Sequence, residues 1–304
     1  MIASAIPNDL YDYFNRIYRP KKLLGKSERT GRIYTQTFDR FAEFVQHKPM
    51  LIDLTEDNIC GFMDWRISAG RAFHTVDKEA DKLLAITNYA ARKRHIEAFV
   101  DRPNLDPPES LPTCWTREQL TTLLEACRTA AGKFGDAPRS VWWLAFHSLC
   151  LATGERTEAM LLLRWDMLKG DCLSVPASVR KGRRKAARYR LPAGVVATLE
   201  RLRVFTVGAG LIFAAPWKDR KNSFYKHYTG LLRSAGLPEG RDFKPQKLRQ
   251  TFASFLEAAG GDATEALGHV DRRVTKQSYL DTSITEAGKE SPSVIVWRKL
   301  AFDG

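Results

Sequence analysis

Three polar residues near the end of the chain have side chains that could act together on a phosphate ester. Arg249, His269 and Tyr279 each lie beside apolar residues that a helix would bury, within the segment from Lys244 to Asp281. Arginine presents a planar fork of donors that matches phosphate oxygens. A tyrosine hydroxyl can form a covalent intermediate when a neighbouring group activates it. Helical packing of this segment would therefore create a phosphate-binding site with a nucleophile beside it.

Two motifs contain these residues in a fixed order. The first is a Thr-Gly-Glu-Arg run at 153–156, which continues through apolar residues to Trp165. The second is a Gln-Lys-Leu-Arg run at 246–249, followed by Leu-Gly-His at 267–269 and then Tyr279. This order resembles the tyrosine recombinases, the phage integrase family, whose pattern is Thr-Gly-x-Arg, His-x-x-Arg, Leu-Gly-His and a nucleophilic Tyr. Two motifs in the family's order are far more specific than either motif alone.

The resemblance implies a site-specific DNA recombinase of the integrase type. Tyr279 would attack a DNA phosphodiester, giving a 3′-phosphotyrosine and a free 5′-hydroxyl, and a second 5′-hydroxyl would then rejoin the strand. The ester conserves the bond energy, so neither ATP nor a metal or other cofactor is expected. Arg156 and Arg249 would stabilise the charge that develops on the phosphate. His269 would form a hydrogen bond to the phosphate.

The chain departs from the family pattern at three places. Gln246 stands where the family has its first histidine, and an amide donates hydrogen bonds but carries no proton near neutrality. Ala159 stands where the family has an acidic residue, and Glu158 is one place early, on another part of the helix. The segment between Arg249 and His269 is about one helical turn shorter than usual, which nearly preserves the helix face. These differences bear on efficiency more than on family membership.

A dense run of positive charge lies between two predicted strands, residues 173–177 and 187–191. Seven of the eleven residues from 180 to 190 are basic. Such a run is either a solvated loop or a contact for a polyanion, and its self-repulsion favours the polyanion. In the family this β-hairpin carries the lysine that acts as general acid; Lys181 matches best and Lys185 is the alternative. The predicted DNA contacts are Arg180, Arg183, Arg184, Lys185, Arg92, Lys93 and Arg94.

The composition limits the class of protein. With 44% hydrophobic and 27% charged residues among 304, the chain is typical of a soluble globular protein. Its formal net charge of +13 indicates an acidic partner, with nucleic acid as first candidate and a ribosomal or membrane surface as alternatives. The five cysteines are scattered without a Cys-x-x-Cys pair, which argues against a zinc ribbon or a disulfide framework. The absence of a signal peptide or a long apolar run predicts a cytoplasmic, nucleoid-associated protein without membrane contact.

We expect two domains and a tail, in a fold that is mainly α with a small β-hairpin or sheet. Residues 1–102 have apolar side chains at helical spacing and predict a helical bundle that resembles the family's DNA-binding core-binding domain. Four prolines in residues 103–112 predict a linker. Residues 113–285 predict an α+β catalytic domain of the integrase type, in which a helix runs from 156 to 165. Residues 286–304 form a tail that is expected to dock on a neighbouring protomer.

Two other functions share parts of this pattern. A type IB topoisomerase would use the same chemistry to nick and close DNA without a defined site. A DNA-binding protein of the same fold with weakened or lost catalysis would account for Gln246, although binding alone requires no phenol at Tyr279. The recombinase implies double-stranded DNA with a specific target site, a homotetramer on DNA, and a monomer or weak oligomer when free. DNA-bending accessory proteins are further candidate partners.

Overall fold

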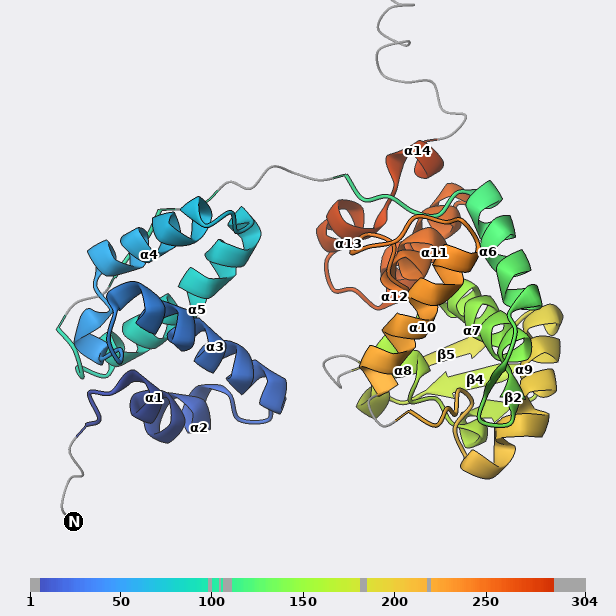
Figure 1. Ribbon diagram of the computed structural model, residues 1–304, viewed down its shortest axis with the longest axis horizontal. Coiled ribbons are helices and arrows are strands. Elements are labelled where there is room, and N and C mark those ends of the chain that lie inside the picture. Colours follow the sequence, from blue (N-terminus) through green and yellow to red (C-terminus); the bar gives the residue numbers. More distant parts are fainter. Residues whose placement is uncertain are drawn as a thin grey trace, which may run out of the picture. The chain divides into compact units, whose positions relative to one another are not determined.

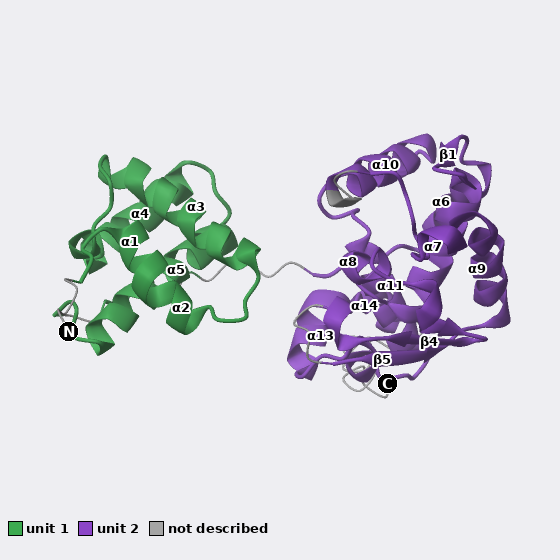
Figure 2. Cartoon of the chain, turned by 90° about the horizontal axis from the view of Figure 1, so that it is seen from below, with its two compact units in different colours: residues 1–109 green, residues 110–304 purple. Residues whose placement is uncertain are grey.

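The computed structural model of the chain describes residues 6–97, 100–103, 105, 111–180, 185–217 and 220–286, without the side chains of Arg220 and Lys221. The chain divides into two compact units, residues 1–109 and residues 110–304, which Figure 2 shows in different colours. Helices predominate in both units, and the strands that the structure describes all lie in the second, so the predicted fold class is confirmed. None of the described helices is both long and apolar enough to cross a membrane.

The first unit is a helical bundle (Figure 1). Its elements are α1 (Leu10–Tyr13), a π-helical turn (Phe14–Tyr18), α2 (Arg19–Lys22), α3 (Glu28–Val45), a 3₁₀ turn (Leu51–Asp53), α4 (Glu56–Ser68) and α5 (Phe73–Arg92). Helices α3, α4 and α5 pack against one another, and Phe38 and Phe41 of α3 are completely buried in their shared core. Thr55 caps the start of α4 by accepting a hydrogen bond from the backbone N–H of Asn58. Apolar packing therefore explains the aromatic spacing along α3.

An ion pair lies inside this first unit. Arg66 of α4 is 6% exposed and Glu79 of α5 is 4% exposed. The guanidinium donates from Nε to Oε2 at 2.8 Å and from Nη2 to Oε1 at 3.1 Å. Arg40 of α3 donates a further hydrogen bond of 2.9 Å to the same carboxylate. The pair therefore joins all three long helices of the bundle, and the buried positive charge is neutralised locally.

The second unit is built around one buried helix. Its helices are α6 (Arg117–Thr129), α7 (Arg139–Thr153), α8 (Thr157–Met160), α9 (Ala193–Thr206), α10 (Arg220–Ser234), α11 (Gln246–Ala258), α12 (Ala263–Leu267), α13 (Arg272–Tyr279) and α14 (Thr282–Thr285). Helix α7 packs against α6, α9 and α11, and its Trp142 and Phe146 are completely buried. Because α7 runs through the core, its C-terminal end delivers the first motif to the side of α11.

A small antiparallel sheet lies beside these helices. Its strands are β3 (Leu168–Lys169), β4 (Cys172–Val175) and β5 (Ala187–Arg190), in the order β3–β4–β5. Leu173 pairs with Tyr189 and Val175 pairs with Ala187, so the two predicted strands form the predicted hairpin. Strand β3 and a further hairpin of β1 (Lys133–Phe134) and β2 (Ala137–Pro138) were not predicted. These three strands have two residues each, too few for an alternating pattern.

The predicted helix from 156 to 165 is wrong, because α8 ends at Met160. The chain then turns and pairs with the segment at 210–212, where the N–H of Ile212 donates to the oxygen of Leu163 at 2.9 Å. Leu163 and Trp165 are nevertheless buried, with 0% and 4% exposure. The apolar run therefore reflects the packing of an extended segment into the core. Over so few residues, the sequence pattern of such a segment cannot be distinguished from that of a buried helix.

The segment that enters the second unit is tied to α11 and to the residue that follows α13. The N–H of Cys114 donates to Asp281 Oδ2 at 2.8 Å, and the N–H of Trp115 donates to Thr251 Oγ1 at 3.0 Å. Lys247 of α11 donates to Thr113 Oγ1 at 2.6 Å. The start and end of the catalytic fold thus meet at one place.

Helices α11 to α14 are held together by a small apolar cluster, separate from the main core. Its buried members are Ala253, Ala263, Leu267 and Leu280, with Phe252 and Tyr279 packed against them. Four small or medium side chains bury little surface, so polar contacts contribute a large share of the order in this region. Both motifs converge here.

Candidate active site

The first motif forms a tight turn at the end of α7. Gly154 has φ of 61°, a left-handed conformation that favours glycine. A Cβ atom at this position would lie 2.3 Å from Cδ1 of Phe252 in α11. Glycine is therefore required both for the turn and for the close approach of α11. The turn leaves the carbonyl oxygen of Gly154 facing α11 and brings Arg156 to the start of α8.

Arg249 is the centre of the site. It lies one turn into α11 and is 1% exposed. Its Nη1 donates to the oxygen of Gly154 at 2.6 Å, and its Nη2 donates to the oxygen of Leu267 at 3.0 Å. Nη2 also lies 3.2 Å from Nε2 of His269. The guanidinium therefore joins the first motif to both parts of the second. Burial, together with the charge of Arg156, lowers the pKa of Arg249.

His269 is a neutral ring between two neighbours. An arginine can only donate, so Nε2 of His269 accepts from Arg249 and the ring hydrogen is on Nδ1. Nδ1 lies 2.9 Å from Oγ1 of Thr275. Burial, and then the charges of Arg249 and Arg156, lower the pKa of His269 to about 4. In this tautomer Nε2 has no hydrogen to give, so the predicted hydrogen bond from His269 to phosphate is absent from the DNA-free arrangement.

Tyr279 ends helix α13 and lies against these groups. Its ring centroid is 4.7 Å from that of His269 and 5.4 Å from Cζ of Arg249. Nε2 of Gln246, the first residue of α11, lies 3.4 Å from the Tyr279 hydroxyl, a long and weak contact. Ser254 of α11 donates to the backbone oxygen of Tyr279 at 3.1 Å. The structure thus brings together four residues that the motifs singled out.

Arg156 completes the group with a second positive charge. Its charge lowers the pKa of both Arg249 and His269, which places it near both side chains. Within the described ranges, no carboxylate forms an ion pair with either Arg156 or Arg249. Two guanidinium groups beside a phenol, without a direct ion-pair partner among the described carboxylates, suit the recognition of an external phosphate.

A profile of the phage integrase family matches residues 114–286, more than half of the 304 residues. The chain belongs to the phage integrase family. The predicted resemblance is thereby confirmed, and the enzyme is a tyrosine recombinase that breaks and rejoins DNA. The matched region contains both motifs and ends shortly after Tyr279. A comparison with curated proteins gave no match.

Solved structures of other integrases have the same fold. A lambda integrase tetramer bound to a Holliday junction matches with a TM-score of 0.69 and 17% identity, over 89% of this chain and 80% of that chain. The Tn1549 transposon integrase in complex with a circular intermediate DNA matches with 0.68 and 11%, over 97% and 100%. The XerH site-specific recombinase bound to its difH substrate matches with 0.59 and 19%, over 77% and 69%. At these identities the likeness shows the fold.

This integrase has a buried acid that the sequence analysis missed. Glu155 is 3% exposed, and its Oε1 forms an ion pair of 2.7 Å with Nε of Arg180. The same oxygen accepts a hydrogen bond of 2.7 Å from the Tyr189 hydroxyl of β5. Ala159, where the family has its acid, is 2% exposed and has no polar group. The sequence signal was an acid beside Arg156, but only the fold shows its partners.

Arg180 was predicted as a DNA contact, and the structure gives it a different place. It is 8% exposed and paired with Glu155. Its Nη1 also donates to the backbone oxygens of Lys185 and Ala186, at 3.3 and 3.5 Å. Arg180 therefore links Glu155 to the backbone at Lys185 and Ala186, and its contact with DNA stays a prediction.

The remaining predicted DNA contacts divide into two groups. Lys181, Arg183 and Arg184 lie outside the described residues. Lys185 is exposed at the other end of the loop. Arg92, Lys93 and Arg94 are exposed at the end of α5, in the first unit.

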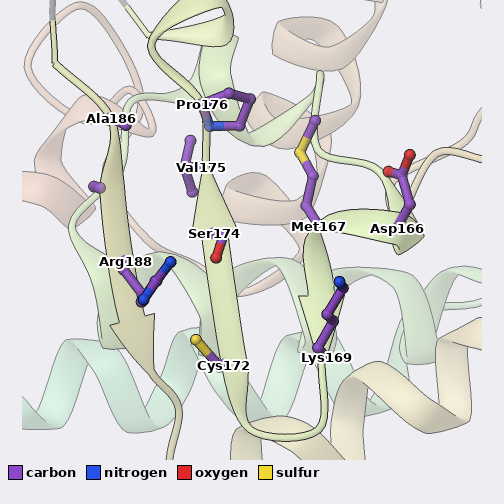
Figure 3. Close-up of a pocket in the computed structure, with 10 residues that line it drawn as sticks. Asp166, Met167, Lys169, Cys172, Ser174, Val175, Pro176, Ala186 and Arg188 are labelled. Atoms are coloured by element: carbon purple, nitrogen blue, oxygen red, sulfur yellow. The ribbon is translucent and has the colours of Figure 1, made fainter.

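One hollow of the second unit lies away from the predicted catalytic residues. It has a volume of about 850 Å³ and covers the outer face of the β3–β4–β5 sheet, where Lys169, Ser174 and Arg188 line it (Figure 3). None of Arg156, Arg249, His269 or Tyr279 lines it. At the candidate site Arg249 is buried, whereas Arg156, His269 and Tyr279 are each half-buried.

Proposed function

We propose that this recombinase cleaves DNA with Tyr279 and holds the cleaved end as a 3′-phosphotyrosine. One observation carries the assignment. Arg249 is buried, has no ion-pair partner among the described carboxylates, and lies 5.4 Å from the centre of the Tyr279 ring. A buried cation without a local anion is costly, so its retention is explained by an anion that arrives with the substrate.

In the cleavage step the Tyr279 oxygen forms a bond to phosphorus while the bond from phosphorus to the 5′-oxygen breaks. Arg156 and Arg249 bind the non-bridging oxygens, where negative charge grows in the transition state. Lys181 gives its proton to the leaving 5′-oxygen, with Lys185 as the alternative general acid. The phenol proton passes to water, because Gln246 cannot accept it near neutrality. Rejoining reverses the step with a 5′-hydroxyl from another strand, so no ATP is used.

His269 has a supporting role in the DNA-free protein. Because its Nε2 accepts from Arg249, it helps to hold the guanidinium fork in one orientation. A guanidinium in a fixed orientation stabilises the transition state more than a flexible one does, since no reorganisation is needed when the transition state forms. We therefore assign to His269 the role of orienting the guanidinium of Arg249.

The wider assembly is part of the same proposal. Residues 113–285 would form the catalytic domain, and residues 1–102 would hold DNA through Arg92, Lys93 and Arg94. The tail at 286–304, of which only the first residue is described, would dock on a neighbouring copy. The target is double-stranded DNA with a specific sequence, bound by four copies in the nucleoid and bent by accessory proteins. The lambda integrase structure, a tetramer on a Holliday junction, supports this arrangement.

A suicide substrate tests the chemistry directly. A nicked duplex from the ends of the element that encodes the chain loses its short strand after cleavage and so traps the covalent intermediate. We expect an adduct that survives SDS and maps to Tyr279 by mass spectrometry. Tyr279→Phe should abolish the adduct and keep DNA binding, because it removes only the nucleophilic oxygen.

A second tyrosine provides the control. Tyr228 of α10 is buried, and its hydroxyl has no hydrogen-bond partner in the described structure. Tyr228→Phe should therefore leave the adduct unchanged. Tight, salt-sensitive binding without any adduct would support a binding protein that has lost catalysis. Relaxation of plasmids that lack the target site would support a topoisomerase.

A further inference from the structure

Helix α13 carries Tyr279 but has little apolar surface to hold it. Of its eight residues only Thr275 is buried, with 0% exposed. The apolar cluster beside the helix has four buried members, and α13 contributes only partly buried Tyr279 to it. A helix that buries one polar side chain needs a specific partner for that side chain, because an unpaired buried hydroxyl is unfavourable.

The Thr275 hydroxyl is used differently from those of five other buried helical threonines. In five helices a buried threonine donates its hydroxyl hydrogen to the carbonyl oxygen four residues earlier, the usual local arrangement. These residues are Thr37, Thr87, Thr153, Thr206 and Thr251. Thr275 has no such bond in the described structure, and its Oγ1 instead lies 2.9 Å from Nδ1 of His269. The contact therefore joins two segments instead of satisfying one helix.

The direction of this hydrogen bond follows from the far side of the ring. Arg249 donates to Nε2 of His269, so Nδ1 carries the ring hydrogen and donates to the Thr275 oxygen. The opposite tautomer would direct a ring N–H at the guanidinium N–H, which is repulsive. Arg249 thus sets the tautomer, and the Thr275 oxygen accepts the Nδ1 hydrogen and holds the ring from its other side.

Thr275 and Tyr279 are four residues apart, so they lie on the same face of α13. The hydrogen bond to Thr275 and the ring contact of 4.7 Å to Tyr279 hold His269 from two points on one helix. We propose that Thr275 is a positioning residue of this recombinase: it accepts from Nδ1 of His269, holds the ring in place against α13, and so sets the distance between the nucleophile's helix and Arg249. This proposal rests on the proposed role of Tyr279 as nucleophile.

Two substitutions separate the hydroxyl from the shape of the side chain. Thr275→Val keeps the shape and removes the acceptor, and Thr275→Ser keeps the acceptor. With the nicked suicide duplex in single-turnover conditions, Thr275→Val should form the adduct about tenfold more slowly, as expected for one lost hydrogen bond in the site. Its affinity for the same DNA should be unchanged. Thr275→Ser should recover most of the rate.

Thr206 of α9 supplies a matched control. It is 2% exposed, and its Oγ1 accepts a hydrogen bond of 3.2 Å from the indole N–H of Trp165, away from the site. Thr206→Val therefore also removes a buried threonine oxygen that accepts from an aromatic ring N–H. It should leave the adduct rate unchanged after correction for the folded fraction. An equal loss of rate in both valine variants would show a general effect on stability and overturn the positioning role.

Nitrogen-15 NMR of the full chain gives a readout that does not depend on activity. In the wild type, His269 should show the Nδ1–H tautomer; in Thr275→Val the tautomer should stay the same, but the Nδ1–H signal should shift and exchange faster with water because its acceptor is gone, and an unchanged signal would overturn the positioning role. A wild-type Nε2–H tautomer would overturn the proposal even if the valine variant failed to fold. If the wild type forms no adduct, the proposed function fails; if the wild type and Thr275→Val form it at equal rates, only the role of Thr275 fails.

Discussion

Each unit buries an arginine, and the two arginines are held in different ways. Arg66 in the first unit, 6% exposed, lies with its fork on the carboxylate of Glu79. Arg249 in the second unit, 1% exposed, donates to two backbone carbonyl oxygens and a neutral histidine. Arg66 is paired directly with a carboxylate, whereas the hydrogen bonds of Arg249 go to neutral groups.

This difference in partners distinguishes Arg66, which has a structural role, from Arg249, whose charge is available to a substrate. A buried ion pair satisfies both partners, and breaking it leaves an uncompensated charge. Carbonyl oxygens fix the direction of a guanidinium but leave its charge in place. Arg249 therefore reaches the active site rigid and still positive, which is the condition for stabilising a transition state without reorganisation. The comparison predicts opposite consequences for substitutions at the two positions.

The largest expected effect is on the adduct rate of Arg249→Gln. Loss of one transition-state donor should slow covalent adduct formation by about 10²–10³-fold. Stability should fall by only about 1–3 kcal/mol, because lost carbonyl contacts are partly offset by removal of a buried charge. Arg66→Gln is the matched change in the other unit. It should cost about 3 kcal/mol, since Glu79 keeps only Arg40, and leave the rate of the folded fraction unchanged.

Single-turnover trapping and urea unfolding of the full chain measure these two quantities, and hydrogen exchange locates the loss. Protection should fall in residues 6–97 for Arg66→Gln and around α11 for Arg249→Gln. If Arg66→Gln and Arg249→Gln lose similar amounts of stability and neither slows adduct formation, the distinction between the two arginines is wrong.

A somewhat smaller effect is expected at Arg180, which has a charge partner like Arg66 but lies at the base of the basic loop. Arg180→Met should reduce stability by about 3 kcal/mol, at the low end for a broken buried pair, because Tyr189 still donates to Glu155. It should not change the salt dependence of DNA binding. Lys185→Ala, at the exposed end of the loop, should lower the slope of log affinity against log salt by about 0.9. Fluorescence anisotropy at several salt concentrations measures both slopes, and a lower slope in Arg180→Met would restore it as a phosphate contact.

The smallest expected effect is the dependence of stability on acidic pH through His269. His269 has a pKa of about 4, below its ordinary 6.5, first through burial and then through Arg249 and Arg156. A folded-state pKa below the unfolded value means that the contribution to stability is present above about pH 6.5 and is lost as the pH falls through about 4. In Arg249→Gln the pKa of His269 should rise but stay below 6.5, because burial remains. The titration must be residue-specific, since burial also lowers the pKa of His147 to about 4. An unchanged His269 titration in the variant would show that Arg249 carries no influence there.

Much of the site could be predicted because its motifs are local. Gln246, Arg249, His269 and Tyr279 follow one another on a few helices, and short-range spacing already implies that they meet. The hairpin of β4 and β5 was visible for the same reason. Arg180 could not be assigned from sequence, because most of the residues that follow it to Arg190 are basic and its one acidic partner lies in another motif. The structural role of a charge depends on a partner that spacing does not show.

The errors have a similar physical origin. The run from 156 to 165 is apolar enough for a buried helix, yet Leu163 pairs with Ile212 in an extended segment. The residues there are apolar because they are buried, and the segment is extended because it pairs with a distant part of the chain. Thr275 was not recognised, because a single threonine in a polar helix has no distinguishing pattern until its hydroxyl is seen on His269.

The first residues of the second unit, Cys114 and Trp115, are hydrogen-bonded to two separate parts of that unit, and this has a mechanical consequence. The N–H of Cys114 donates a hydrogen bond to Asp281, two residues beyond Tyr279, and the N–H of Trp115 donates to Thr251, on the same helix as Arg249. The chain that leaves the proline-rich segment therefore reaches the catalytic fold through bonds to both. A load applied at residues 114–115 would therefore be shared between the segment that follows α13 and the middle of α11, and it would act on the spacing of Tyr279 and Arg249.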